Sequence, residues 1–194
     1  MLGAILIVAG FFLVAGRAPV AFVDPAPVAV VAVVRGPAAS GDPSSPPAVA
    51  EATRDPRAPI PTGYRIQIPR LSIDLPIAEG DVARDIDQQK TPESFAFHLP
   101  GSAIPGQGSN TYLYAHARTG MFLTLWNAQP GDEIFISTPD LRVLTYVVQD
   151  VHPRVAPDDV SWVQPTPSER LTLQTSTGPN SGDPRFVVVA VPAR

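Results

Sequence analysis

The chain has 194 residues, of which 44% are hydrophobic, and it carries a formal net charge of -4. This length accommodates one globular domain plus an appendage, and the acidic balance argues against a sequence-independent nucleic-acid binder. The chain contains no cysteine, which excludes disulfides, cysteine-ligated zinc, iron–sulfur clusters and a thiol nucleophile.

Residues 1–17 form the first composition zone, in which Leu2–Gly16 reads LGAILIVAGFFLVAG without a charge. As a helix this run spans about 22 Å, less than the roughly 30 Å hydrocarbon core of a bilayer. We therefore expect either a signal anchor, lengthened by a snorkelling Arg17, or a cleaved signal peptide. Arg17 and Arg35 follow the run and no basic residue precedes it, so the charge distribution does not settle the orientation.

Residues 18–60 form a second zone, rich in proline, alanine and valine. Prolines stand at positions 19, 25, 27, 37, 43, 46, 47, 56 and 59. Prolines at this density interrupt helices and the hydrogen-bond ladders of sheets. The zone is predicted to be a semi-extended, disordered tether.

Residues 61–194 are predicted to form an all-β domain. Alternating or continuous apolar residues mark strands over Tyr64–Pro69, Leu71–Ile77, Asn110–His116, Asp132–Ser137, Leu141–Val151, Leu171–Thr177 and Phe186–Val191. In the longest of these, Leu141, Val143, Val147 and Val151 are expected on one side. Turns at Pro-Gly pairs and short helices at 122–128 and 158–163 complete the pattern, and the run 81–87 is expected to be a solvated connection. The pattern predicts a closed eight-stranded β-barrel with short helices.

Familiar catalytic signatures are missing from this domain. The sequence has no G-x-S-x-G elbow, no H-E-x-x-H motif and no phosphate-binding loop. The three histidines, His98, His116 and His152, lie far apart in sequence, so a three-histidine metal site is not expected. No cofactor is implied either. His98 and His152 each adjoin a turn and are expected at the surface.

Two predicted strands end in polar residues that suggest chemistry. His116 ends the strand NTYLYAH, and Ser176 ends LTLQTS, which is followed after a short loop by Arg185. A hydroxyl nucleophile, a proton carrier and a cation for a developing oxyanion are the groups that acyl transfer requires. Taken without further information, the same residues also fit a strand-end histidine, a turn serine and a solvated arginine.

The order of these segments resembles the sortases, the cell-envelope transpeptidases of mainly Gram-positive-type bacteria. The resemblance covers nearly all of residues 61–194, and the hydrophobic segment and tether that precede them are also typical of the family. The matching pieces are Ile68–Ile77, Asn110–His116, Phe122–Leu125 with Gly131–Ile134, Leu171–Ser176, and Arg185 at the start of the last strand.

The resemblance implies a function and a set of site residues. His116 would shuttle protons, Ser176 would occupy the nucleophile position and Arg185 would stabilise the oxyanion. Thr175, Thr172 and Tyr114 would contact the substrate, an LPxTG-like sorting-signal peptide of an exported protein, and an amine would accept the acyl group. The resemblance also implies a bacterial single-pass membrane protein with an extracytoplasmic catalytic domain.

Two positions depart from the family pattern: Ala115 replaces a common glycine, and Ser176 replaces the catalytic cysteine. A serine hydroxyl does not ionise at neutral pH, so it needs a general base within about 2.6–3.2 Å. No carboxylate adjoins His116 in sequence, although Asp150 or Asp158 could reach it from elsewhere. Three hypotheses stay open: a serine-dependent transpeptidase or hydrolase, an inactive module that binds a peptide or envelope partner, and an engineered serine that traps a complex.

Overall fold

The computed structural model describes residues 58–88 and 90–194, and the predicted anchor (1–17) and most of the predicted tether (18–60) lie outside them. Eight strands form a closed barrel in the order β1-β2-β3-β4-β7-β8-β6-β5. This confirms the predicted barrel. The strands are β1 (Arg65–Ile68), β2 (Ile73–Glu79), β3 (Ala96–His98), β4 (Asn110–Tyr114), β5 (Glu133–Ser137), β6 (Val143–Val155), β7 (Arg170–Ser176) and β8 (Arg185–Pro192).

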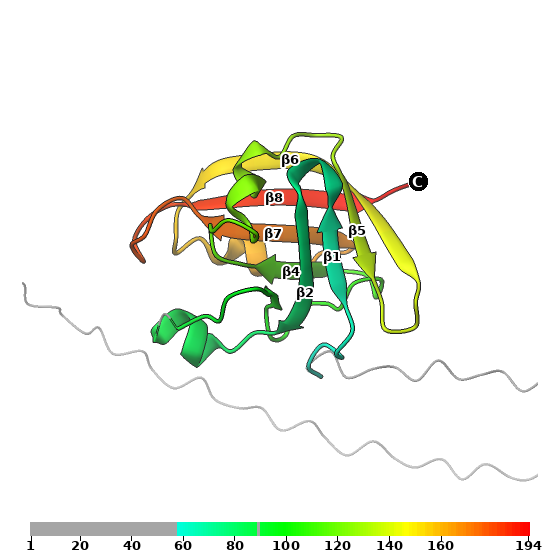
Figure 1. The fold of residues 1–194 in the computed structure, drawn as a ribbon, viewed down its shortest axis with the longest axis horizontal. Coiled ribbons are helices and arrows are strands. Elements are labelled where there is room, and N and C mark those ends of the chain that lie inside the picture. The colour runs from blue at the N-terminus through cyan, green and yellow to red at the C-terminus, as the bar shows by residue number, and fades with distance from the viewer. Residues whose placement is uncertain (1–57, 89) are drawn as a thin grey trace, which may run out of the picture. The chain divides into compact units, whose positions relative to one another are not determined.

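Two of the strand pairs, β2–β3 and β4–β7, are parallel, and the other six are antiparallel. Because β4 and β7 run the same way, their carboxyl ends meet at one end of the barrel, on the left in Figure 1. Strand β8 starts at this end, after the connection 177–184. Three segments that are distant in sequence therefore meet at one end of the barrel.

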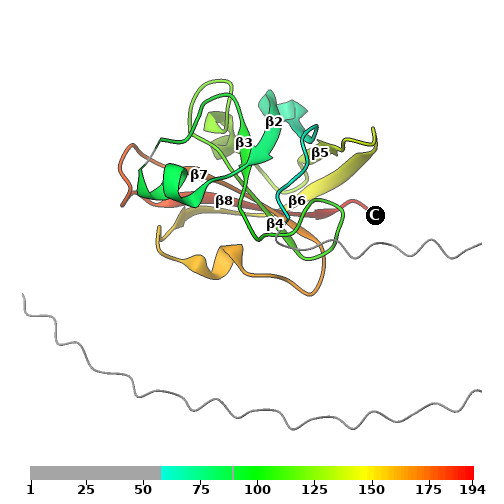
Figure 2. The same ribbon diagram turned by 90° about the horizontal axis from the view of Figure 1, so that it is seen from below.

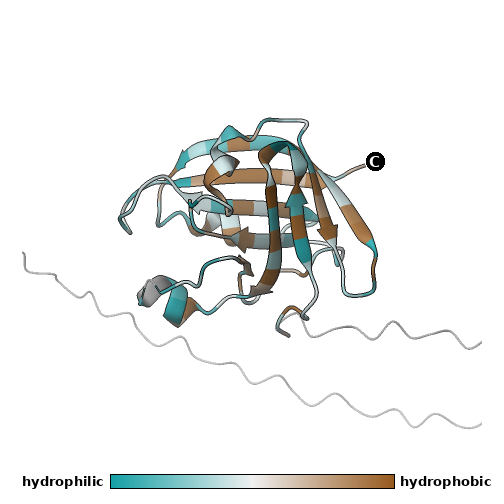
Figure 3. Ribbon diagram, in the orientation of Figure 1, coloured by the Kyte–Doolittle hydropathy of each residue, from teal (hydrophilic) through white to brown (hydrophobic). Residues whose placement is uncertain are grey.

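The core fills the barrel with alternate residues of its strands, as the period of two requires. Ile66 and Ile68 of β1, Leu171 and Leu173 of β7, and Val188 of β8 are all at most 1% exposed. Figure 3 shows the apolar residues concentrated on the strands and the polar residues concentrated in the connections. On β4, β7 and β8, the residues that alternate with the core positions, such as Tyr112 and Gln174, lie on the outer face of the barrel.

The predicted face of β6 is wrong over most of the strand. Leu141 and Val143 are 92% and 58% exposed, and it is Leu144, Tyr146 and Val148 that pack on the core. A register shift between Val148 and Asp150 then moves the alternation by one residue, which turns Val151 toward the core. A β-bulge of this kind reverses the inward face beyond it.

The short elements agree in part with the predictions. The 3-10 turns η3 (Leu123–Asn127) and η4 (Val160–Val163) confirm the two predicted short helices. A third 3-10 turn, η1 (Pro69–Leu71), occupies the predicted start of the second strand. The run 81–87, expected to be solvated, contains the π-helical turn η2 (Ala83–Asp87), and its Asp85 is only 8% exposed. Within residues 58–88 and 90–194, no helix is long and apolar enough to cross a membrane.

Candidate active site

The structure brings His116, Ser176 and Arg185 together at one end of the barrel. Ser176 pairs with Arg185 across β7 and β8. Tyr114 pairs with Gln174 in the parallel β4–β7 ladder, and the amide of Ala115 continues the ladder by donating to Gln174 at 3.2 Å. This backbone pairing brings His116, two residues after β4, beside the end of β7, and Arg185 lies on the other side of Ser176.

Ser176 is half-buried at the end of β7, and its hydroxyl makes no hydrogen bond with the described residues. Its backbone carbonyl accepts a hydrogen bond from the indole nitrogen of Trp126 at 3.2 Å. The preceding Thr175 is 1% exposed and donates its hydroxyl to the carbonyl of Ala115 at 2.9 Å. Ser176 is thus fixed by its backbone and its neighbours, while its hydroxyl stays available to a substrate.

His116 is held by a backbone carbonyl. Its Nε2 lies 2.9 Å from the carbonyl oxygen of Thr91, in the connection between η2 and β3. A carbonyl only accepts, so Nε2 carries the proton and donates it. Among the described residues, neither Asp150 nor Asp158 forms a hydrogen bond with His116, and the Ser176 hydroxyl forms none either. Sequence reasoning missed Thr91 because a backbone carbonyl leaves no mark in the side-chain pattern.

Arg185 is half-buried, and the connection before β8 holds it. Its Nη1 donates to the carbonyl of Asp183 at 3.1 Å and its Nη2 donates to the carbonyl of Ser181 at 2.9 Å. These bonds leave the guanidinium charge without a carboxylate partner among the described residues. The charge also acts on the neighbouring phenol of Tyr112, where burial raises the pKa and Arg185 opposes that rise. An uncompensated cation beside Ser176 can stabilise a developing oxyanion.

The residues predicted to contact a substrate lie on or beneath the β4–β7 surface. Thr172 is fully buried and donates to Asn110 Oδ1 at 2.8 Å, and Thr175 bridges β7 to the end of β4 as described above. The hydroxyl of Tyr114 donates to Asp85 Oδ2 at 2.5 Å, on the side of η2. Tyr112 and Gln174, joined by their own hydrogen bond, lie on the same outer face as Ser176.

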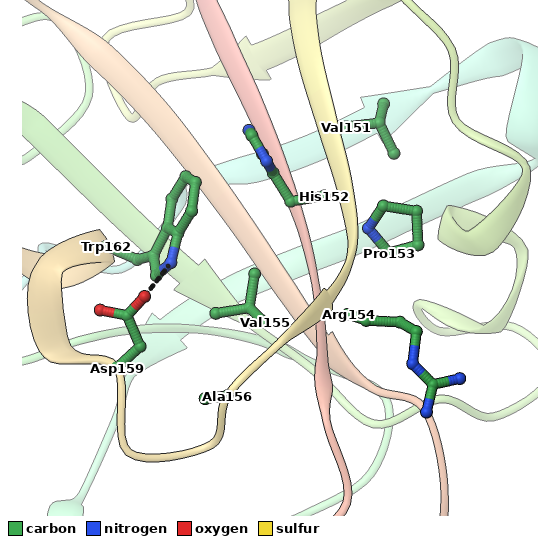
Figure 4. Close-up of a pocket in the computed structure, with 8 residues that line it drawn as sticks. All are labelled: Val151, His152, Pro153, Arg154, Val155, Ala156, Asp159 and Trp162. Atoms are coloured by element: carbon green, nitrogen blue, oxygen red, sulfur yellow. Dashed lines mark hydrogen bonds between the residues drawn. The ribbon is translucent and has the colours of Figure 1, made fainter.

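A hollow of about 520 Å³ continues this outer face beyond Arg185. Val155 pairs with Arg185 and lines the hollow together with His152 and Trp162, as Figure 4 shows. The rings of His152 and Trp162 are 4.4 Å apart, and the indole donates to Asp159 at 2.9 Å. Figure 2 shows η4 and its connection as a layer outside β8 and β6. The lining of the hollow is mixed: Val155 and the Trp162 ring are apolar, and Arg154 and Asp159 are charged.

A second serine–histidine–carboxylate cluster lies inside the protein. His98 is 1% exposed, which corrects the expectation of a surface residue. Its Nδ1 lies 2.8 Å from Glu79 Oε2 and its Nε2 lies 3.0 Å from the hydroxyl of Ser102. That hydroxyl donates to the carbonyl of Leu99 and accepts from the amide of Tyr112. Ser102 is only 8% exposed and its hydroxyl is fully engaged, so we assign the cluster a structural role.

Metal-ligating residues do not gather in this domain: residues 58–88 and 90–194 contain no group of three histidine or acidic side chains that could hold an ion. Three side chains meet at the candidate site. Those are an imidazole, a hydroxyl and a guanidinium, which together can carry out acyl transfer.

Comparison with known proteins identifies the fold. The model of the sortase domain matches residues 66–193. A lid mutant of sortase A from Corynebacterium diphtheriae is 30% identical, with a TM-score of 0.58, over 71% of this chain and 73% of that one. Sortase C-1 from Actinomyces oris is 26% identical, with a TM-score of 0.58, over 69% of this chain and 75% of that one. None of the curated proteins compared with the chain matches it significantly. The chain therefore belongs to the sortase family, a family of transpeptidases.

Proposed function

We propose that the protein is a sortase-type transpeptidase or hydrolase that acts on LPxTG-like sorting signals of exported proteins, with Ser176 as its nucleophile. The observation that carries the proposal is the arrangement of His116, Ser176 and Arg185 on adjoining strands of a sortase barrel. The nucleophile position holds a hydroxyl, and the residues on either side of it are those that acyl transfer needs.

The proposed reaction has two acyl-transfer steps. The Ser176 oxygen attacks the peptide carbonyl carbon, His116 takes the hydroxyl proton, and Arg185 stabilises the oxyanion. The intermediate collapses, the carbon–nitrogen bond breaks, and His116 returns the proton to the leaving amine. An amine acceptor then attacks the carbonyl carbon of the serine ester and loses a proton to His116. The bond from that carbon to the Ser176 oxygen breaks, and His116 returns the proton to Ser176. Water in place of the amine gives hydrolysis.

The surface around the site supports a peptide substrate. Tyr112 and Gln174 form part of the outer face beside Ser176. The hollow shown in Figure 4 lies on the far side of Arg185 from Ser176. An extended peptide laid over this face would place its scissile carbonyl at Ser176 and an apolar side chain in the hollow, against Val155 and Trp162. The hollow combines the apolar walls Val155 and Trp162 with the polar groups of Arg154 and Asp159, and ligand sites likewise combine apolar walls with polar groups that fix orientation.

The proposal includes a location. The uncharged run Leu2–Gly16 and the proline-rich residues 18–60 fit a membrane anchor and a tether that hold the barrel outside the cytoplasm of a bacterial cell. This placement brings the site to exported proteins, which are the substrates proposed above.

A second candidate function is a catalytically inactive module that binds a sorting-type peptide or an envelope partner. It is favoured by one observation: His116 and the Ser176 hydroxyl are not hydrogen-bonded, and a serine needs a base within about 2.6–3.2 Å during attack. In this candidate the same surface binds the peptide, and no bond is cleaved.

Peptide turnover and peptide binding, measured together, separate the two candidates. The purified protein is incubated with a pool of LPxTG-like peptides and an amine acceptor, and products are identified by mass spectrometry. Turnover that disappears in Ser176→Ala and persists in the control Ser181→Ala supports the enzyme. Saturable binding without product supports the binding module. Turnover that persists in Ser176→Ala overturns the assigned nucleophile, and a protein that neither binds nor cleaves these peptides overturns both candidates.

A further inference from the structure

The base of the proposed site is oriented by a backbone carbonyl, and that carbonyl has a support of its own. We propose that Thr91 takes the part that a carboxylate plays in a serine–histidine–aspartate triad, and that Asp85 and Tyr114 are positioning residues that hold Thr91 against His116. The kinetic consequence of this proposal rests on the proposed function, whereas the structural consequence does not.

The contact between Thr91 and His116 selects one form of the imidazole. Nε2 donates to the Thr91 carbonyl at 2.9 Å, so a neutral ring carries its proton there and leaves the lone pair on Nδ1. Nδ1 makes no hydrogen bond with the described residues, so it is the ring nitrogen left to act as a base toward Ser176. In a triad, the third group fixes the ring in this manner.

The direction of the Thr91 carbonyl is set locally. Pro92 follows Thr91 and restricts it to extended backbone conformations. The amide of Lys90 donates to the carbonyl of Arg84 at 2.9 Å, and the Thr91 hydroxyl lies 3.5 Å from the carbonyl of Asp85. Thr91 is therefore tied to the turn η2.

The turn η2 is fastened to the barrel through Asp85. Arg84 donates to its two carboxylate oxygens at 2.5 and 2.9 Å, and the amide of Asp81 donates at 3.1 Å. Tyr114 of β4 donates its hydroxyl to the same carboxylate at 2.5 Å. Tyr114 is two residues before His116, so this one bond links the strand that carries the base to the segment that orients it.

The charge state of this link is well defined. Burial alone raises the pKa of Asp85, but the hydrogen bonds from Arg84 and Tyr114 outweigh it and lower that pKa below its usual value. Burial and the bond to Asp85 raise the pKa of Tyr114. At neutral pH the carboxylate is ionised and the phenol is protonated, which is the combination that makes a strong charge-assisted hydrogen bond.

Gly80 shows how closely the connection from β2 to η2 packs against Tyr114 of β4. A Cβ at this position would overlap the Tyr114 hydroxyl and lie 2.8 Å from the carbonyl of His98. The amide of Gly80 donates to that carbonyl at 2.8 Å. The connection to η2 thus starts in contact with Tyr114, which leaves little room for η2 to shift relative to β4.

The test compares two substitutions that each remove one hydroxyl. Tyr114→Phe removes the bond to Asp85, while Tyr146→Phe removes a bond of the same kind to Glu169, away from the site. A second variant, Asp85→Asn, weakens the same link and leaves Tyr114 intact. Each protein is examined by NMR for the His116 ring proton on Nε2 and for the protection of that proton from exchange with solvent, and then by peptide kinetics.

We expect an exchange-protected Nε2 proton in the native protein and in Tyr146→Phe, because it is bonded to the Thr91 carbonyl, and loss of that protection in Tyr114→Phe and Asp85→Asn. We expect kcat to fall about three- to tenfold in the latter two with KM unchanged, because one hydrogen bond positions the base. A rise in KM alone would instead make Tyr114 a substrate contact and overturn the proposal.

The NMR result separates this proposal from the proposed function. If the ring proton behaves as expected but no peptide is cleaved, the positioning role stands and the enzymatic proposal fails. The positioning proposal is overturned if the native protein lacks a protected Nε2 proton on His116, or if Tyr114→Phe retains both that protection and the native kcat.

Discussion

Replacing Ser176 by cysteine should change the reaction more than any other single substitution in the site. The structure places Ser176 between His116 and Arg185 without a hydrogen bond from its hydroxyl to the imidazole. A thiol does not require that bond, because it can lose its proton before it attacks. A hydroxyl must transfer its proton to a base during the attack.

The expected magnitude follows from this difference. General-base assistance contributes about 10²- to 10⁴-fold to a rate, and serine forgoes it whenever His116 is out of reach. A thiol with an unperturbed pKa of about 8.5 is roughly one-tenth ionised at pH 7.5, and the adjacent guanidinium of Arg185 favours further ionisation. We therefore expect Ser176→Cys to cleave peptide at least about 100-fold faster than the native protein.

The assay measures initial rates of peptide cleavage and of amide formation with an amine acceptor. Ser176→Ala gives the baseline. Ser181→Cys is the matched control, because it places a thiol in the connection before Arg185, and the chain has no other cysteine. Alkylation with iodoacetamide should abolish the activity of Ser176→Cys and leave the native rate unchanged.

Equal or slower cleavage by Ser176→Cys, together with measurable native turnover, would refute this reasoning. It would show that His116 comes within hydrogen-bond distance of Ser176 when the peptide binds, so that the resting arrangement does not govern the reaction. Activity in Ser181→Cys above the Ser176→Ala baseline would show that the thiol acts from outside the site.

Three further predictions concern the rest of the domain. His98→Phe removes the hydrogen bonds to Glu79 and Ser102 and should lower the free energy of unfolding by about 3 kcal/mol in urea titrations; a loss below about 1 kcal/mol would contradict the structural role. The hydrogen bond from Arg70 lowers the pKa of Asp132, so the folded protein binds fewer protons than the unfolded chain near pH 4, and this contribution to stability is lost as pH falls. The Tm of Asp132→Asn should therefore decrease less than that of the native protein as the pH falls from 7 to 3. An equal decrease in Tm would refute the assignment. Trp162→Ala opens the hollow and should weaken peptide binding about tenfold with little change in kcat, which titration and kinetics check; unchanged affinity would place the peptide elsewhere.

The sequence predicted the barrel and the meeting of three strand ends because both follow from short-range patterns. Alternation marks a half-buried strand, and polar residues that end apolar runs mark where strands leave the core. His116 and Ser176 each end such a run, and Arg185 begins one. Once β4, β7 and β8 are neighbours in the barrel, their ends meet without any further condition.

The features that the sequence did not predict arise from tertiary contacts. Strand β3 is three residues long and has no period of its own. The bulge in β6 reverses the alternation, and the residue type at Gln149 gives no sequence signal that a bulge forms there. His98 is buried because Glu79 and Ser102 supply partners from other segments. The Thr91 carbonyl belongs to the backbone, so any residue at that position could present it.

These differences bear on what a serine means for activity at position 176, the proposed nucleophile position. Backbone pairing between β4, β7 and β8 places the three site residues, and that pairing does not depend on which side chain stands at position 176. The observed arrangement of His116, Ser176 and Arg185 is therefore compatible with both a catalytically active and a catalytically inactive protein. What distinguishes them is whether Nδ1 of His116 reaches the Ser176 hydroxyl when a peptide is bound. Because Thr91 and the link from Asp85 to Tyr114 fix the other side of that ring, the reach of the base depends on the segment that holds it as well as on the nucleophile.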